Sequence, residues 1–190
     1  MKSVKNLTLT AMFFAIGLLL PFLTGQVPQI GSMLLPMHLP VFLCALICGW
    51  KYGVTMAMLL PITRSLIFTM PPLYPVAIAM TFELGTYALV AGLMYEKSRW
   101  QCVRALYGCI VTAMIAGRIV WGLMMALLMG IKGNTFTFQA FISGAVLNAI
   151  PGIIIQLILI PAIMVALDRA KLVPFRHEKK KAARTAIDRG

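Results

Sequence analysis

LLPMHLPVFLCALICGW, residues 34–50, decides the fold class, because these seventeen residues are almost entirely apolar. Such a run approaches the roughly 20 residues that an α-helix needs to cross the ~30 Å hydrocarbon core of a bilayer. One ionisable side chain, His38, stands inside the run, two residues from each of the helix-breaking residues Pro36 and Pro40. The stretch therefore predicts a membrane span with an imidazole near its start.

The rest of the chain has the same character. Its 190 residues are 61% hydrophobic and only 12% charged, whereas about a quarter of the residues of a soluble domain are charged. The stretches 34–50 and 54–70 are short and interrupted by proline, and all connections are brief. We expect an all-α integral membrane protein whose six transmembrane helices form one domain, residues 1–167, followed by a basic tail, 168–190. The six predicted spans are 7–25, 34–50, 54–70, 74–95, 103–131 and 138–167.

The chain has a net charge of +12, and the positions of its lysines and arginines follow the predicted membrane topology. Fourteen of the seventeen lysines and arginines lie before the first predicted span, in alternate loops or in the tail, and the opposite loops contain only Lys132. This is the positive-inside pattern, which places both termini in the cytoplasm. We interpret the tail as a topogenic segment at the surface of the lipid bilayer and expect no nucleic-acid partner.

Two other interpretations of the sequence are rejected. The first 25 residues have the basic start and apolar run of a signal peptide, but no small-x-small cleavage site follows Leu23, so we interpret them as the first helix. The cysteines form no CxxC pair, so we expect neither a metal site nor a cofactor. The four are Cys44, Cys48, Cys102 and Cys109.

Ionisable side chains inside spans are costly and are therefore candidate functional residues. Counting helical rise from the predicted outer ends places them in the outer half of the membrane or near its middle, with His38 roughly 6 Å deep and Arg118 near 20 Å. This grouping predicts a pocket open to the outside. The candidate substrate-binding residues are His38, Arg64, Glu83, Arg118, Trp121 and Asn148.

Each candidate also has a structural interpretation. Arg64 and Glu83 lie at similar depth on consecutive antiparallel spans, which predicts an ion pair that either stabilises the fold or forms a pocket wall. Arg118 then has no acidic partner, because Glu83 is the sole carboxylate in the predicted spans, and we expect it to meet a ligand. Trp121 either lines the pocket or packs between helices. Asn148 either lines the pocket or forms a hydrogen bond to another helix.

The charges suggest the kind of ligand. Two arginines and one glutamate leave the pocket at +1 with His38 neutral, which favours a small organic anion, most simply a carboxylate. His38 either contacts this ligand or bonds to a carbonyl freed by Pro36 and Pro40.

Three stretches together resemble a known family. They are LTLTAMFFAIGLLLP (7–21), LLPMHLPVFLCALICGWKYGVTMAMLLPITRSLIFTMPPLYP (34–75) and AMTFELGTYALVAGLMY (79–95). With six short spans and a basic N-terminus, they resemble the S components of energy-coupling factor (ECF) transporters. The Pro-His-Pro to Gly-x-Lys-x-Gly run resembles the subgroup that includes pantothenate, folate and pyrimidine-precursor binders.

The resemblance implies a substrate-binding subunit in the cytoplasmic membrane of a bacterium. It implies capture of a vitamin or similar micronutrient from outside, with loops 25–33 and 132–137 as lids. It also implies partners, namely a transmembrane scaffold protein and two ATPase subunits. Ala11 and Ala15, at i and i+4, would then form the docking face for the scaffold. The chain has no Gly-x-x-x-x-Gly-Lys-Ser/Thr motif, so any ATP hydrolysis must come from a partner.

Other functional classes remain as alternatives. An intramembrane enzyme is disfavoured, since the spans contain one histidine and one carboxylate and no catalytic motif. An accessory or assembly protein acting through helix–helix contacts would bind no ligand. A stand-alone channel or carrier would move solute without ATPase subunits.

Overall fold

The structure, a computed structural model, describes residues 2–24, 36–98, 101–131 and 149–173. Within these ranges every regular element is helical. The elements are α1 (Lys2–Leu19), the 3₁₀ helix η1 (Leu20–Thr24), α3 (His38–Ile47), α4 (Trp50–Phe68), the π-helical turn η2 (Leu73–Ala77), α5 (Ile78–Lys97), α6 (Val103–Ile131) and α8 (Ile150–Arg169).

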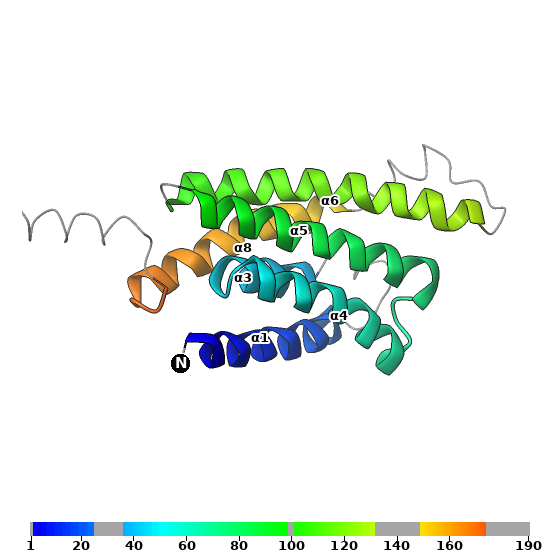
Figure 1. The fold of residues 1–190 in the computed structure, drawn as a ribbon, viewed down its shortest axis with the longest axis horizontal. Coiled ribbons are helices and arrows are strands. Elements are labelled where there is room, and N and C mark those ends of the chain that lie inside the picture. The colour runs from blue at the N-terminus through cyan, green and yellow to red at the C-terminus, as the bar shows by residue number, and fades with distance from the viewer. Residues whose placement is uncertain (1, 25–35, 99–100, 132–148, 174–190) are drawn as a thin grey trace, which may run out of the picture.

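The helices pack side by side with alternating direction (Figure 1). α1 forms one edge and packs on α3 and α4, whereas α5 packs on α3, α4 and α6. α8 packs on α6 and α3. The start of α1 and the end of α8 lie at the same end of the bundle (Figure 1), as an even number of passes requires.

Four described helical stretches are long and apolar enough to cross a membrane: Val4–Phe22, Leu73–Lys97, Val103–Ile131 and Ile150–Arg169. Their outer surfaces are apolar too. On α6, for example, Ile115, Ile119 and Leu123 are exposed and follow one another at intervals of four residues. A helix that exposes such a stripe requires an apolar solvent. The protein is therefore a membrane protein.

Helices lie at the predicted spans 34–50 and 54–70, but their ends differ from the predicted ones. α3 has ten residues, which is about 15 Å and half the hydrocarbon thickness. Only Cys48 and Gly49 separate it from α4, and Gly49 has a φ of +100°, a conformation that glycine adopts readily. Trp50, the predicted end of the second span, and Lys51, predicted between the second and third spans, therefore begin α4. α4 has 19 residues but is not among the four spans, because Lys51 and Arg64 lower its mean hydropathy.

The last predicted span, 138–167, is described only in part. α8 begins at Ile150 and continues to Arg169, and residues 138–148 lie outside the described ranges. Pro151 stands at the start of α8, where its missing N–H costs no intrahelical hydrogen bond.

The centre of the bundle is an apolar core. Most residues of α3 are buried in this core. α1 joins this core through Phe13, which is buried, and through the amide Nδ2 of Asn6, which donates to the carbonyl of Cys48 at 3.2 Å. One face of α1 is thus fixed to the turn between α3 and α4, and the other face is left outside.

The approach of α4 to α3 is close because residue 53 is glycine. A Cβ at that position would lie 2.6 Å from the Cβ of Ala45 and 2.7 Å from its Cα. Both distances are shorter than van der Waals contact, and the second is to backbone, so the two helices would have to separate to admit it.

We therefore expect Gly53→Ala to lower the free energy of unfolding by about 1–3 kcal/mol, the usual cost of overpacking. The measurement is equilibrium unfolding of the purified chain in mixed detergent micelles. Gly108→Ala is the matched control, since a Cβ there would meet no atom within 4 Å. Equal stability of the two variants would contradict the close approach.

Candidate functional site

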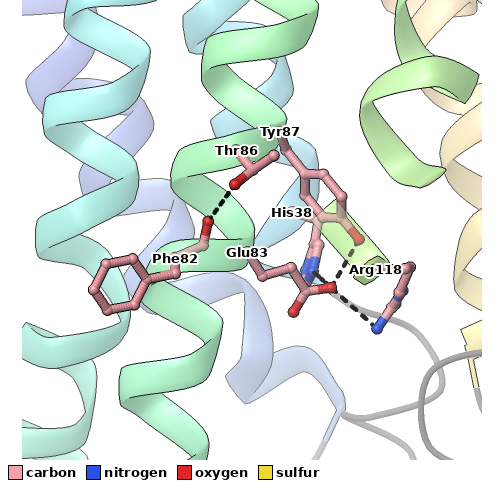
Figure 2. Close-up of polar contacts among 6 residues, drawn as sticks. All are labelled: His38, Phe82, Glu83, Thr86, Tyr87 and Arg118. Atoms are coloured by element: carbon pink, nitrogen blue, oxygen red, sulfur yellow. Dashed lines mark hydrogen bonds and ion pairs between the residues drawn. The ribbon is translucent and has the colours of Figure 1, made fainter. Parts of the chain in front are cut away.

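Three helices bring four polar side chains to one point inside the bundle (Figure 2). His38 is the first residue of α3, and Arg118 lies in the middle of α6. Glu83 and Tyr87 lie one turn apart on α5 and therefore share a face of that helix. We call these four residues the polar cluster.

One carboxylate oxygen organises the polar cluster. Glu83 Oε1 lies 3.0 Å from Arg118 Nη1 and 3.7 Å from His38 Nε2. The hydroxyl of Tyr87 donates to the same oxygen at 2.7 Å. Glu83 and His38 are each 1% exposed and Tyr87 is 2% exposed, so the carboxylate charge is held away from solvent. Burying it is tolerable because these three side chains compensate it.

The polar cluster lies at mid-depth of the bundle. Glu83 precedes the last residue of α5, Lys97, by fourteen residues, or about 21 Å of helix, and Arg118 follows the start of α6 by fifteen residues, about 22 Å. His38 lies ten residues, about 15 Å, from the α3–α4 turn. The predicted depth of His38, roughly 6 Å from the outer surface, stays a prediction, because it was counted from residue 34, which lies outside the described residues.

Arg64 is not part of the polar cluster, and the predicted Arg64–Glu83 ion pair is wrong. Arg64 Nη1 donates to the carbonyl of Leu18 at 2.7 Å, and its guanidinium carbon lies 5.5 Å from the ring centroids of both Phe22 and Phe68. The carbonyl is available because Pro21, three residues on, has no N–H for a 3₁₀ bond. Arg64 thus faces α1, whereas Glu83 faces α3 and α6.

The prediction that Arg118 has no acidic partner is also wrong, since Glu83 is that partner. One edge of its guanidinium nevertheless remains open. Nε and Nη2 of Arg118 are buried and have no hydrogen-bond partner within the part of the chain that the structure describes. Buried donors without acceptors are destabilising, and this pair of N–H groups matches the two oxygens of a carboxylate.

The charge of the site changes with this assignment. Counting Arg64 gave a predicted pocket charge of +1, but the polar cluster alone contains one carboxylate and one guanidinium. With His38 neutral, its formal charge is zero. The excess positive charge from which the sequence predicted an anionic ligand is therefore not a property of the polar cluster.

Two predicted site residues remain, Trp121 and Asn148. Trp121, one turn beyond Arg118 on α6, is half-buried and packs on a second apolar cluster that includes Met125 and Leu128. The hydroxyl of Tyr74 donates to the carbonyl of Leu128 there, which joins η2 to α6. Asn148 lies outside the described residues.

Tyr87 was missed by the sequence analysis. The signal was its position four residues after Glu83, which places both side chains on one face of a helix. Within the described ranges, no group of three histidine, cysteine, aspartate or glutamate side chains could hold a metal ion.

The ion pair between Arg118 and Glu83 can be tested through stability. Arg118→Met and Glu83→Met each leave the opposite charge buried and unpaired, so each should cost about 3 kcal/mol of unfolding free energy. The double variant should cost clearly less than the sum of the two single variants. Equilibrium unfolding in detergent micelles of all four proteins measures this coupling.

Arg64→Met is the control for this cycle. This substitution also removes a guanidinium, but one that binds the carbonyl of Leu18 and not Glu83. Its effect on the unfolding free energy should therefore add to that of Glu83→Met. Additive effects of Arg118→Met and Glu83→Met would contradict the ion pair.

Comparison with known families identifies one match. The family model described as ECF transporter, substrate-specific component, matches residues 5–164. This range begins near the start of α1 and ends within α8, so it contains nearly all of the described helices. Neither a curated protein nor a solved structure matches the chain.

Proposed function

Since the chain belongs to the substrate-specific components of ECF transporters, we propose that it captures a small, vitamin-like carboxylate from outside the cell. The family role is that of a membrane subunit that binds a small molecule and works with an ECF module. Transport is thus the function of the assembly, and binding is the function of this chain.

The observation that carries the proposed substrate class is the open edge of Arg118. Nε and Nη2 are buried donors without acceptors among the described residues, and Nη1 is held by Glu83. A carboxylate fits such a pair of parallel N–H groups with two charge-assisted hydrogen bonds. In the proposed site Arg118 binds this group, and Glu83, which His38 contacts in turn, holds Arg118 in place through Nη1.

Trp121 lies one turn from Arg118 on the same helix and in this proposal contacts the apolar part of the substrate. Asn148 remains a proposed contact on the basis of the sequence. Arg64 is left out of the proposed site because it binds the end of α1.

The outer face of α1 supports a proposed contact with the scaffold protein of the module. Ala11 and Ala15 are exposed and lie one turn apart, and Phe13 and Gly17 on the other side of the helix are buried. Small side chains at i and i+4 let a partner helix approach closely. The module would supply two ATPase subunits as well as this scaffold.

The proposed setting is the cytoplasmic membrane of a bacterium. Residues 1–167 would form the six-span domain, with both termini and the basic tail 168–190 in the cytoplasm. The common end at which α1 starts and α8 ends supports this topology (Figure 1), and the positive-inside pattern supports its orientation.

The substrate class can be tested with pantothenate, folate and orotate, together with their carboxamides, in equilibrium binding to the purified chain. We expect at least one acid to bind, and its carboxamide to bind about tenfold more weakly or worse, because it loses charge-assisted hydrogen bonds. Arg118→Gln should weaken binding of the acid by a similar factor. Arg64→Gln is the matched control and should retain the affinity. Undiminished binding to a folded Arg118→Gln variant would overturn the assignment.

The docking face makes a separate prediction. Replacing Ala11 and Ala15 with leucine should abolish co-purification with the scaffold and ATPase subunits, because the added side chains prevent close helix packing. Binding of the acid should persist. Ala126→Leu, also at an exposed alanine but on α6, is the control and should leave the complex intact. A complex that forms normally with leucine at both positions would show that this face of α1 is not the docking face for the scaffold protein.

A further inference from the structure

Arg118 and Glu83 are paired in an unusual way. A guanidinium and a carboxylate commonly pair as a fork, with two parallel hydrogen bonds. Here the contact runs through Nη1 of Arg118 alone, and Nε and Nη2 have no acceptor among the residues described. A rotation of the Glu83 carboxylate toward that edge would satisfy both donors, so some other contact must hold Glu83 back.

The hydroxyl of Tyr87 makes that contact. It donates to Glu83 Oε1 at 2.7 Å, the same oxygen that meets Arg118 Nη1 (Figure 2). A hydrogen bond to a charged acceptor is stronger than one between neutral groups. Glu83 would have to break it, or drag the tyrosine ring along, in order to turn onto the Nε and Nη2 edge.

The ring of Tyr87 is prevented from following. On the α6 side it lies against the backbone at Gly117, where a Cβ would be only 2.1 Å from the ring atom Cε1. On the α3 side it stacks on Phe42, with centroids 5.2 Å apart and planes at 20°, and it contacts His38 at 5.3 Å. Packed on both sides and 2% exposed, the ring fixes the position of its hydroxyl.

We propose that Tyr87 is a positioning residue that keeps Glu83 on Nη1 of Arg118 and so reserves the Nε and Nη2 edge for the substrate. This inference rests on the proposed function for the identity of the occupant. Gly117 takes part as the neighbour that admits the ring between α5 and α6. Without the Tyr87 hydroxyl, Glu83 would itself occupy the edge and compete with an anionic substrate.

The direct test is a crystal structure of the full chain carrying Tyr87→Phe, grown without added substrate beside the unsubstituted chain. This variant keeps the ring and removes only the hydroxyl. We expect Glu83 to pair with Arg118 through two hydrogen bonds that include Nη2. A Glu83 that still contacts Nη1 alone would overturn the proposal, whether or not any substrate has been found.

Binding supplies the second readout. For the acid among pantothenate, folate and orotate that binds the unsubstituted chain, Tyr87→Phe should weaken binding about tenfold, as expected for competition by a charged hydrogen-bonded pair. In a Glu83→Gln background, which has no competing carboxylate, the same change should weaken binding less than twofold. An equal loss in both backgrounds would show that Tyr87 acts by another route and would overturn the proposal.

Tyr95→Phe is the matched control. Tyr95 is a buried tyrosine on the same helix, two turns beyond Tyr87, and its substitution should leave both the Glu83 geometry and the affinity unchanged. If none of the three acids binds the unsubstituted chain, the proposed substrate class fails. The crystal structures then still decide whether Tyr87 controls Glu83.

Discussion

The buried carboxylate of Glu83 is the constraint on which the arrangement of the helices depends. A carboxylate without partners inside an apolar bundle would cost several kcal/mol. Its compensation comes from three directions: Arg118 on α6, His38 on α3 and Tyr87 on its own helix. α3, α5 and α6 must therefore meet at one depth and in one rotation for the protein to be stable. Apolar packing alone would accept several rotations of each helix.

This constraint also determines which donors of Arg118 lack an acceptor among the described residues. Two donors, the Tyr87 hydroxyl and Arg118 Nη1, meet one oxygen of Glu83, and His38 Nε2 lies 3.7 Å from it. The guanidinium of Arg118 is thus held through Nη1, whereas its Nε and Nη2 have no acceptor among the residues that the structure describes. A binding subunit benefits from such a site, because donors already held in place lose little entropy when a substrate arrives.

The proposed binding site and the proposed docking face are separated within the fold. The polar cluster is built by α3, α5 and α6, whereas α1 packs on α3 and α4 at the edge of the bundle. Arg64 binds the carbonyl of Leu18 and contacts Phe22 and Phe68, so it fastens the C-terminal end of α1 to α4. A residue that the sequence assigned to the substrate pocket thereby holds the helix that carries the proposed docking face.

The sequence predicted the helices better than it predicted their contacts. Apolar runs are sufficient to place α5 and α6, because hydrophobicity and length decide whether a segment can cross a bilayer. They mislead at 34–50, where the short α3 ends in the turn at Cys48 and Gly49. Helical rise placed Arg64 and Glu83 at similar depth but contains no information on which neighbour each side chain faces.

The rotation of each helix about its axis decides that Glu83 pairs with Arg118 and not with Arg64. Only the contact between Glu83 and Tyr87 could be predicted from spacing, because the two residues lie four apart on one helix. The family resemblance was identified from three stretches of sequence, the number of predicted spans and the basic N-terminus, and it is confirmed by the match over residues 5–164. The subgroup named from the Pro-His-Pro run stays a prediction.

Native mass spectrometry of the purified chain, released gently from detergent, tests the central claim most directly. A tight-binding subunit should retain one small acidic molecule per chain, and Arg118→Gln, equally folded, should be released without it. A molecule retained equally by Arg118→Gln would contradict a site built on the open edge of Arg118.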